Sequence, residues 1–304
     1  MNRLANRKFL REEQKQFSPY NDTQPWTFKK REMAKPFTDI TARYFLDSRI
    51  GNAIANLKNE QPHLILGETH CHSTFSDGLH SVQSILQRSS RLGLDYVVIT
   101  DHLLPGKYLT DSITGSLQEQ IRCINEWDQP CKPVQIYPAF EISALEGHLV
   151  FIFDAKCFSS ENIRDISLQF SKYDYEFVSM LELIPLIESF GGISIIAHPE
   201  RKRAYPFGTP IKWVKENLIG LVDGIEDISS GHGYRENYSF DLNLASIGSS
   251  DDHFNLLTGT AVTTYDGNTH NDLISAVKSR QTKAITIENS LQHFLKIARQ
   301  IVYL

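Results

Sequence analysis

The segment from residue 67 to residue 78, GETHCHSTFSDG, brings together residue types that can bind a metal ion. His70 and His72 are separated by one residue, so on an extended strand both imidazoles project from the same face. Two imidazoles at the end of a strand can hold one ion, and Asp77 lies close behind them. A single H-x-H pair also occurs in many proteins without metal, so the prediction depends on ligands elsewhere in the chain.

Further residues of ligand type stand at the ends of short apolar runs, or, for His148, at the start of one. They are Asp101, His102, Glu141, His148, His198, Asp251 and His253. Chemistry gathers at the C-terminal ends of strands in α/β barrels, so we expect these side chains to converge. Five histidines do not lie at strand ends: His63, His80, His232, His270 and His293. The converging set exceeds the ligands of one zinc ion, which predicts two to three divalent ions, and the lack of thiolates favours Zn, Mn or Fe.

The elements that must position these residues are visible as apolar runs rich in β-branched residues, which predict strands. The runs span 64–69, 95–100, 134–140, 148–153, 193–197, 221–226, 244–248 and 259–264. Segments with helical spacing of apolar residues lie between several of them, at 81–92, 179–190 and 271–278. This alternation indicates a parallel α/β sheet or barrel. Residues 1–60 lack it, apart from a candidate helix over 38–57, and are predicted to form an N-terminal extension on a catalytic domain of residues 61–304.

Composition and charge narrow the class of protein. Four cysteines without C-x-x-C spacing are typical of reduced thiols, and neither a signal peptide nor a membrane span is predicted, so we expect a cytoplasmic protein. Residues 1–35 carry nine Lys and Arg against four Asp and Glu, which leaves a net charge of −10 for the remainder. An acidic body argues against binding of an extended nucleic-acid duplex, which needs a basic stripe. The pattern predicts no oligomeric state.

Taken in order, the motifs H-x-H…S-D-G, T-D-H, a strand-terminal Glu, a His, A-H-P and S-D-x-H over residues 67–253 resemble the polymerase and histidinol phosphatase (PHP) family of metal-dependent phosphoesterases. The resemblance implies a distorted (β/α)7 TIM-like barrel that holds up to three divalent ions. It also implies a supporting rather than a ligating role for Asp101. The residues to which it gives metal roles are His70, His72, Asp77, His102, Glu141, His148, His198, Asp251 and His253.

The family pattern and the expected geometry together suggest a division of labour. Glu141 would bridge two ions, one held also by His70, His72 and Asp251 and the other by His148 and His198. The third ion would take Asp77, His102 and His253. Glu141, Asp251 and His198 would be the catalytic core, since a metal-activated water would attack phosphorus there. Guanidinium and ammonium groups suit phosphate, and the candidates are Arg201, Arg203 and Lys107, with Arg235 weaker.

The predicted function is therefore hydrolysis of a small phosphorylated metabolite or nucleotide. Three alternatives stay open. The first is an exonuclease-like hydrolase of short oligonucleotides or nucleotide bisphosphates, which the short separation of His148 and His198 disfavours because it leaves little room for a lid. The second is an amidohydrolase-type C–N hydrolase, which the absence of a metal-bridging lysine pattern disfavours. The third is a metal-stabilised binding module without catalysis, which the complete ligand set disfavours.

Overall fold

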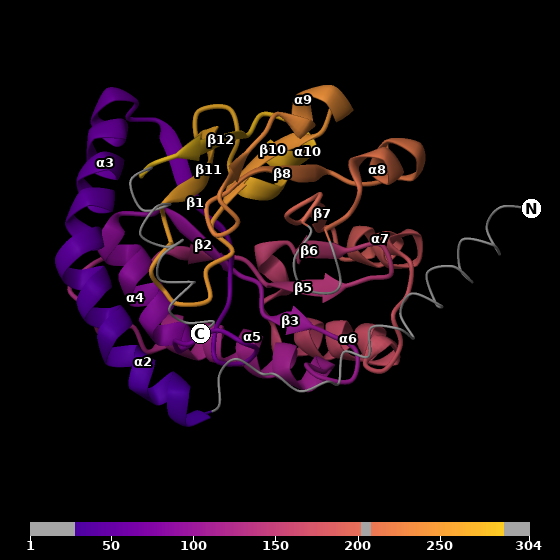
Figure 1. The fold of residues 1–304 in the computed structure, drawn as a ribbon, viewed down its shortest axis with the longest axis horizontal. Helices are drawn as coiled ribbons and strands as arrows, with labels where there is room; N and C mark the ends of the chain where they lie inside the picture. The colour runs from indigo at the N-terminus through magenta and orange to yellow at the C-terminus, as the bar shows by residue number, and fades with distance from the viewer. Residues whose placement is uncertain (1–27, 202–207, 289–304) are drawn as a thin grey trace, which may run out of the picture.

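The computed structural model describes residues 28–201 and 208–288, which form a mixed α/β structure (Figure 1). In chain order the helices are α2 (Phe28–Thr41), α3 (Asp47–Glu60), α4 (Val82–Leu92), α5 (Thr110–Asn125), α6 (Ser160–Phe170), α7 (Met180–Ser189), α8 (Ile211–Asn217), α9 (Tyr238–Leu242) and α10 (Leu273–Lys278). A π-helical turn, η1 (Ala42–Leu46), joins α2 to α3, and two 3-10 turns, η2 (Ala155–Cys157) and η3 (Ser171–Tyr173), flank α6. Pro185 lies inside α7, as the sequence indicates.

The strands form two sheets. The first has the order β12-β11-β1-β2-β4, with bounds β12 (Lys283–Thr286), β11 (Ala261–Asp266), β1 (Leu64–Cys71), β2 (Tyr96–Ile99) and β4 (Gln135–Ile136). The second has the order β10-β8-β7-β6-β5-β3, with β9 paired to β8. Its bounds are β10 (Ala245–Ser249), β8 (Gly224–Ser229), β7 (Ile193–Ile196), β6 (His148–Ile152), β5 (Ala139–Ser143), β3 (His102–Leu103) and β9 (Tyr234–Arg235).

The expectation of a parallel sheet is correct only in part. β1 pairs in parallel with β2, and β7 with β8, but β11 is antiparallel to β1, and β6 is antiparallel to both of its neighbours. The reason is local: Ser143 and His148 are paired residues joined by a tight turn, so β5 and β6 form a hairpin instead of a crossover. Each of the eight predicted apolar runs nevertheless overlaps at least one strand.

Backbone contacts connect the two sheets at the C-terminal ends of their central strands. On one side the His72 N–H donates to the Asp252 carbonyl at 3.0 Å. On the other, the Glu141 N–H donates to the Asp101 carbonyl at 3.2 Å. Strand pairing within the described ranges defines two sheets and not one closed barrel. The ends of β1, β2, β5 and β10 are nevertheless brought to a common rim.

Gly248, on β10, permits the close approach of the sheets on the first of these sides. A Cβ atom at this position would lie 2.4 Å from the Val262 carbonyl oxygen of β11, closer than real contacts allow. The Gly248 N–H accordingly reaches the Thr263 hydroxyl at 3.0 Å, and its carbonyl accepts from the Thr69 hydroxyl of β1 at 3.0 Å. The absence of a side chain at Gly248 therefore sets the spacing between β10 and its neighbours.

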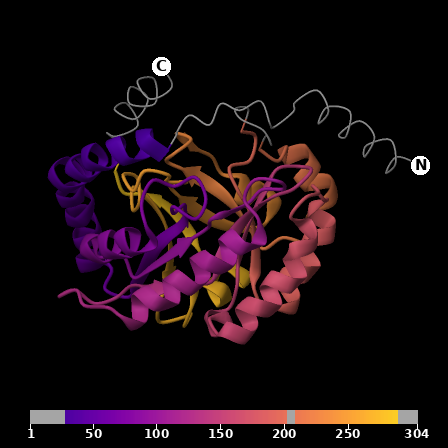
Figure 2. The ribbon, with the colours of Figure 1, turned by 90° about the horizontal axis from the view of Figure 1, so that it is seen from below.

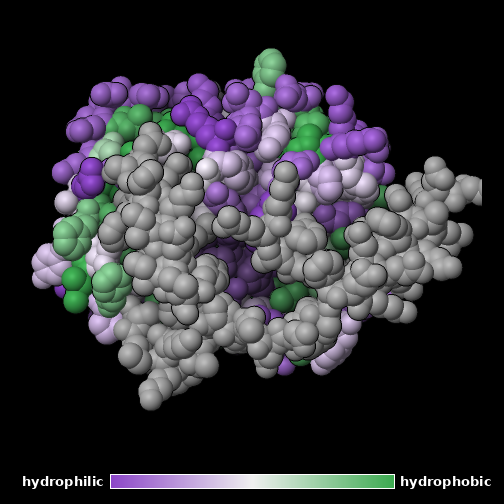
Figure 3. All heavy atoms as spheres, in the orientation of Figure 1, coloured by the Kyte–Doolittle hydropathy of each residue, from purple (hydrophilic) through white to green (hydrophobic). Residues whose placement is uncertain are grey.

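Helices cover the outside of the strands, as Figure 2 shows from a second direction. The largest apolar cluster packs α5, α6 and α7 against β5, β6 and β7 through residues such as Phe140, Phe151 and Phe170. A separate cluster packs η1 and α3 against β1 and α4 through Leu46, Ile50 and Ile54, among others. None of the helices in the described ranges is long and apolar enough to cross a membrane. In the space-filling view, hydrophilic residues line a hollow near the middle of the face toward the viewer (Figure 3).

Candidate metal centre

The rim where the strands end holds five groups of three or four His, Asp and Glu residues, in each of which one ligand atom per residue lies within 4.8 Å of the others. The groups are His72, Asp77, His102 and His253; His70, His72 and Asp251; His70, Glu141 and His198; His102, Glu141 and His148; and His198, His232 and Asp251. All nine predicted ligands occur in them. The groups share members, so the side chains form one continuous cluster.

Glu141 lies at the centre of this cluster, on β5, and is fully buried. Its Oε1 atom is 2.6 Å from His148 Nδ1 and 2.9 Å from His198 Nε2. Its Oε2 atom is 2.9 Å from His102 Nδ1 and 3.3 Å from His70 Nε2. The two oxygens of one carboxylate thus face different pairs of imidazoles, which is the arrangement that a carboxylate shared by two ions requires.

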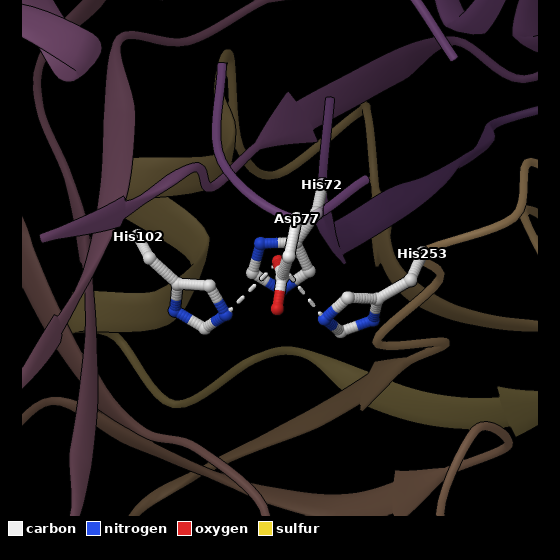
Figure 4. Close-up of side chains that lie close together, drawn as sticks. All are labelled: His72, Asp77, His102 and His253. Atoms are coloured by element: carbon white, nitrogen blue, oxygen red, sulfur yellow. Dashed lines mark ion pairs between the residues drawn. The ribbon is translucent and has the colours of Figure 1, made fainter. Parts of the chain in front are cut away.

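The group formed by His72, Asp77, His102 and His253, which we call the outer group, is shown in Figure 4. Asp77 Oδ1 lies 3.3 Å from His102 Nε2 and 3.3 Å from His253 Nε2. The ring of His72 lies against the other two imidazoles, with centroid distances of 4.3 and 4.2 Å. His72 is on the segment after β1, and the other members come from different loops or short strands, so distant parts of the sequence meet at this point.

The geometry fits bound ions better than it fits hydrogen bonding among the side chains. His70 Nε2 and His72 Nε2 are 3.1 Å apart, and His72 Nε2 is 3.0 Å from Asp251 Oδ1. Two atoms that ligate one ion at about 2.1 Å lie roughly 3.0 to 3.4 Å apart. Within the described part of the chain, Glu141 Oε2 and Asp77 Oδ1 are buried without a hydrogen-bond partner, although imidazole nitrogens surround both. Orphaned carboxylate oxygens among imidazoles are expected where cations bind.

His232 belongs to the cluster and was missed by the sequence reasoning, which left it off the strand ends. Its Nε2 atom lies 2.6 Å from Asp251 Oδ2. The prediction was wrong because β8 extends to Ser229, three residues beyond the predicted run, so His232 follows directly after a strand end. The flanking glycines were the available signal. A Cβ atom at Gly231 would lie 2.2 Å from the Ser250 carbonyl oxygen, which only glycine permits.

Glu226 was also missed, because it lies inside a run that looked like an ordinary buried strand. Its Oε1 atom is 2.8 Å from His70 Nδ1, and its Oε2 atom accepts from the His198 N–H at 2.7 Å. The Glu226 carboxylate therefore accepts a hydrogen bond from the Nδ1–H of His70 and leaves Nε2, which faces Glu141, free to bind an ion.

Asp101 has the supporting role that the sequence suggested. It accepts hydrogen bonds from the Ser73 N–H at 2.8 Å and from the hydroxyls of Ser73, Ser76 and Ser116 at 2.6 Å each. These bonds fix the start of the segment that carries Asp77. Asp101 belongs to none of the five ligand groups.

Two of the clustered residues have a left-handed backbone that non-glycine residues rarely adopt. The φ angle is 27° at His198 and 48° at Asp251. Such conformations cost on the order of 1–3 kcal/mol and persist at functional sites, where the surroundings fix them. Here the strain aims an imidazole and a carboxylate into the cluster from the ends of β7 and β10.

The charges of the cluster raise the pKa values of two imidazoles of the outer group, whereas burial lowers the pKa of the third, His72, to about 4. Burial acts to lower the pKa of His102, but Asp77 and Glu141 outweigh it and raise the value to about 10. Burial likewise opposes the effect of Asp77 and Asp251 at His253, whose pKa rises to about 9. Without metal, both imidazoles therefore carry a proton at neutral pH.

Burial acts to lower the pKa of the inner His70, yet Glu141 and Glu226 raise it well above its usual range. His148 and His198, also deep in the cluster, behave in the opposite way. Burial lowers the pKa of His148 to about 4, despite the adjacent Glu141 carboxylate. Burial and the charge of Arg201 hold the pKa of His198 well below its usual range. Burial acts to raise the pKa of Glu141, yet His148 and the other imidazoles hold it well below its usual range. His148, His198 and Glu141 are thus already in the protonation states that metal binding requires.

The residues expected to bind phosphate differ in where they lie relative to the ligand cluster. Arg201 follows β7, and its Nη2 atom lies 3.3 Å from His148 Nε2, directly beside the cluster. Lys107 is exposed, with its Nζ atom 5.0 Å from the ring centroid of Tyr108, and that ring lies 6.1 Å from the ring of His102. Arg235 is exposed on β9. Arg203 lies outside the described residues.

Comparison with known proteins gives structural matches only. No protein-family model matches the sequence, and no curated protein matches it significantly. A two-domain protein containing a predicted PHP-like metal-dependent phosphoesterase, from Bacteroides vulgatus, is 20% identical with a TM-score of 0.50. The match covers 73% of this chain and 65% of that one, so the chain spans slightly less than two thirds of its length.

Two further solved structures are similar over most of the chain. PsfC from Pseudomonas syringae is 16% identical with a TM-score of 0.53, and the match covers 79% of this chain and 98% of that one. Endonuclease Q, solved with a 27-mer duplex that carries an abasic lesion at its active site, is 13% identical with a TM-score of 0.50. That match covers 72% of this chain and 58% of that one. The chain therefore has the fold found in PHP-like metal-dependent phosphoesterases, and it carries a buried His, Glu and Asp cluster that fits a multinuclear metal site.

Proposed function

We propose that this protein is a metal-dependent phosphoesterase that hydrolyses a small phosphorylated metabolite or nucleotide at a site of two to three divalent ions. The observation that carries the proposal is the position of Glu141, whose two oxygens face separate pairs of imidazoles. A hydrolase of charged phosphoesters needs several cations in one place, and few other functions need such a ligand set. The cytoplasm remains the proposed location, since the described cysteines are unpaired.

The proposed ligand assignment keeps the division expected from the sequence. His70, His72 and Asp251 form one of the groups on the rim, and Asp77, His102 and His253 belong to another, whereas His148 and His198 are linked through Glu141 Oε1. Glu141 would serve two ions, with His70, His72 and Asp251 on one and His148 and His198 on the other, while Asp77, His102 and His253 would hold a third. His232 extends the set that was expected from the sequence, next to Asp251. Zn, Mn or Fe ions bound there would supply Lewis acidity and would make a water molecule more acidic.

The protein's own groups complete the proposed chemistry. Arg201 can donate to phosphoryl oxygens from the side of His148, and a guanidinium fork suits such oxygens better than it suits a neutral amide. Glu226 and Asp101 hold the ligand side chains in place from outside the cluster. Lys107 and Arg203 are proposed as further phosphate contacts, Lys107 near the outer group.

We also infer that the two sheets together represent the distorted (β/α)7 barrel, with residues 1–60 as an extension to a catalytic unit of residues 61–304. The rim hydrogen bonds of His72 and Glu141, one on each side, support this interpretation. So does the packing of helices on the outside of both sheets (Figure 2).

Hydrolysis of short oligonucleotides is the second candidate, and the likeness of the fold to that of Endonuclease Q favours keeping it. The segment between His148 and His198 is filled by the rest of β6, by α6 and α7 and by β7, so it contains no added lid domain. A small substrate is therefore the better proposal.

The test is a screen of the metal-reconstituted full chain against phosphomonoesters, phosphodiesters, short oligonucleotides and N-acyl amides. We expect release of phosphate or alcohol from a small ester that depends on added Mn²⁺ or Zn²⁺ and is lost in Glu141→Gln. Glu146→Gln is the matched control, because this carboxylate is near in sequence but accepts hydrogen bonds from Ser179 and Met180, away from the cluster. Turnover of amides alone, or no metal-dependent turnover in any class, would refute the proposal.

A further inference from the structure

The segment after β1, which carries Asp77, is held in place by backbone hydrogen bonds. Within it, the Thr74 N–H donates to the His80 carbonyl at 2.9 Å, which closes the segment into a compact loop. The next residue toward the N-terminus, Leu79, donates its N–H to the His253 carbonyl at 2.8 Å. The loop that presents Asp77 is thus bonded to the backbone of another member of the outer group.

His80 attaches this loop to helix α2. The imidazole is almost fully buried, and its Nε2 atom lies 2.9 Å from the Thr38 hydroxyl oxygen. That hydroxyl donates its only proton to the Lys35 carbonyl at 2.9 Å, so it accepts from His80 Nε2–H. His80 Nδ1 lies 3.5 Å from Asp39 Oδ1 on the same helix. His80, which the sequence placed off the strand ends, therefore joins the N-terminal helices to the outer group.

Arg88 makes a second, independent connection. It lies on α4 and is one of the largest fully buried side chains, with 1% exposure. Its Nε–H donates to Asp47 Oδ1, at the start of α3, at 2.8 Å. Its two terminal nitrogens donate to the carbonyls of Leu256 and Thr258 at 3.2 and 3.4 Å. A buried guanidinium is tolerated only with such a set of partners, so Arg88 fixes α3 against the loop that follows His253.

The same loop is held from inside by Asp252. Its carboxylate accepts from the N–H groups of Phe254, Leu257 and Thr258 at 2.9, 2.8 and 2.7 Å. Leu256 and Leu257 in turn pack into the apolar cluster that contains Leu46, Ile50 and Ile54 of the N-terminal helices. The loop after His253 therefore rests on the N-terminal segment through both polar and apolar contacts.

We propose that the N-terminal helical segment, residues 28–60, positions Asp77 and His253, and that binding of the outermost ion depends on it. Thr38 and Asp47 are the positioning residues, acting through His80 and Arg88. The inference rests on the proposed metal centre. Apart from His102, the imidazoles around Glu141 lie on β1 and β6 or shortly after β7, and ladder hydrogen bonds hold those strands and β5. Loss of the N-terminal contacts should therefore reduce binding of one ion and spare the others.

The experiment uses the full chain with Thr38→Val and Asp47→Asn, singly and together. Thr38→Val removes the acceptor for His80 at nearly constant volume, and Thr38→Ser restores the hydroxyl. Tyr96→Phe is the matched control, because it removes one buried hydrogen bond of 2.7 Å to the Thr263 carbonyl, made from the first residue of β2, at the opposite end of the strand from the rim. Asp77→Ala serves as the reference for direct loss of the outer group.

Ion content after equilibrium dialysis against Mn²⁺, and affinity by titration calorimetry, give the readout. We expect the double variant to bind one ion fewer than the parent, or at least tenfold more weakly, as Asp77→Ala does. Thr38→Ser and Tyr96→Phe should retain the parental number. Adding Asp77→Ala to the double variant should cause no further loss, since both act on the same ion.

Three outcomes would overturn the inference: an unchanged ion number in the double variant, an equal loss at all sites, or the same loss in Tyr96→Phe. If the double variant does not fold, the single Thr38→Val and Thr38→Ser proteins decide the question by the same measure. A parent that binds no ion would refute the proposed function itself, and this inference with it. A parent that binds ions which Thr38→Val leaves unaffected would refute only the positioning role.

Discussion

The ligands around Glu141 and the ligands of the outer group are built in different ways. Glu141 and His70 lie within strands, and their side chains are fully buried. Asp77 and His253 lie on loops, and their side chains are 33% and 27% exposed. Strands fix ligands through ladder hydrogen bonds, whereas loops need separate supports. The comparison indicates an inner part that is preformed by the fold and an outer part whose order and occupancy can vary.

Among the changes to the ligands around Glu141, we expect Glu141→Gln to reduce turnover most. We expect turnover to fall by about 1000-fold or more, since an amide bridges cations poorly and water activation is lost. Ion content should fall by at least one. Phosphate release and elemental analysis of the same preparation provide the measurement. Retention of a tenth of parental turnover, which is a loss of about 1.4 kcal/mol, would contradict a bridging role.

The affinity of the outer group for an ion should depend steeply on pH. His102 and His253 have pKa values of about 10 and about 9 without metal, so both must lose a proton when an ion binds. Affinity for that ion should therefore rise with pH, by about 100-fold per pH unit below pH 9, and level off above pH 10. Binding through His148 and His198 should release no proton at neutral pH, since their pKa values are lowered.

Calorimetric titrations in buffers of different ionisation enthalpy count the protons released per ion. The predicted count at pH 7.5 is about two for the ion that is lost in Asp77→Ala. A count near zero for that ion would show that the two imidazoles are neutral before metal arrives, and the contrast between the two parts of the centre would disappear.

Replacing Arg201, which lies beside the inner ligand His148, should have a smaller effect on catalysis. Replacement by Met keeps much of the stem and removes the charge beside His148, so we expect catalytic efficiency to fall by roughly 10- to 100-fold for a phosphoester. Ion content should stay unchanged. Arg164→Met, on the exposed face of α6, is the control. If Arg201→Met loses metal instead, the arginine orients His148 and does not bind phosphate.

The smallest effect is expected from removing residues 1–27. In the part of the chain that the structure describes, the hydrogen bonds that link the N-terminal helices to the outer group involve Lys35 and later residues, so we expect unchanged ion content and turnover within about threefold. Steady-state kinetics of the truncated chain test this. Loss of one ion in a folded truncation would extend the support of the outer group to the removed residues.

Much of the site could be predicted from the sequence because strand ends are easy to recognise. β-branched runs fix where strands stop, and the rule that chemistry collects at those ends then selects His70, His102, Glu141 and Asp251. His232 was missed because the end of a strand is uncertain by a few residues, and a shift of three was enough to remove it from the rim.

The parts that could not be predicted depend on contacts between distant segments. Glu226 looks like any polar residue in a strand until His70 is placed against it. The buried role of Arg88 depends on Asp47 and on a loop 170 residues away. Likewise, strands β3 and β9 span only two residues each, which is too short for a periodic pattern in the sequence. Pairing direction between β5 and β6 was set by a turn and not by residue type.

Gly248 has a consequence for the choice of ion. With no room for even a methyl group against Val262, β10 cannot move closer to β11 or retreat without breaking its bonds to Thr69 and Thr263. Asp251, just beyond β10, and His70, on β1, are therefore held at a nearly constant separation. A cage of constant width accepts cations of one size class and excludes wider ones such as Ca²⁺, whose ligands lie about 0.3 Å farther out. If ions bind as proposed, we therefore expect selection by ionic radius to originate at Gly248, outside the ligand set.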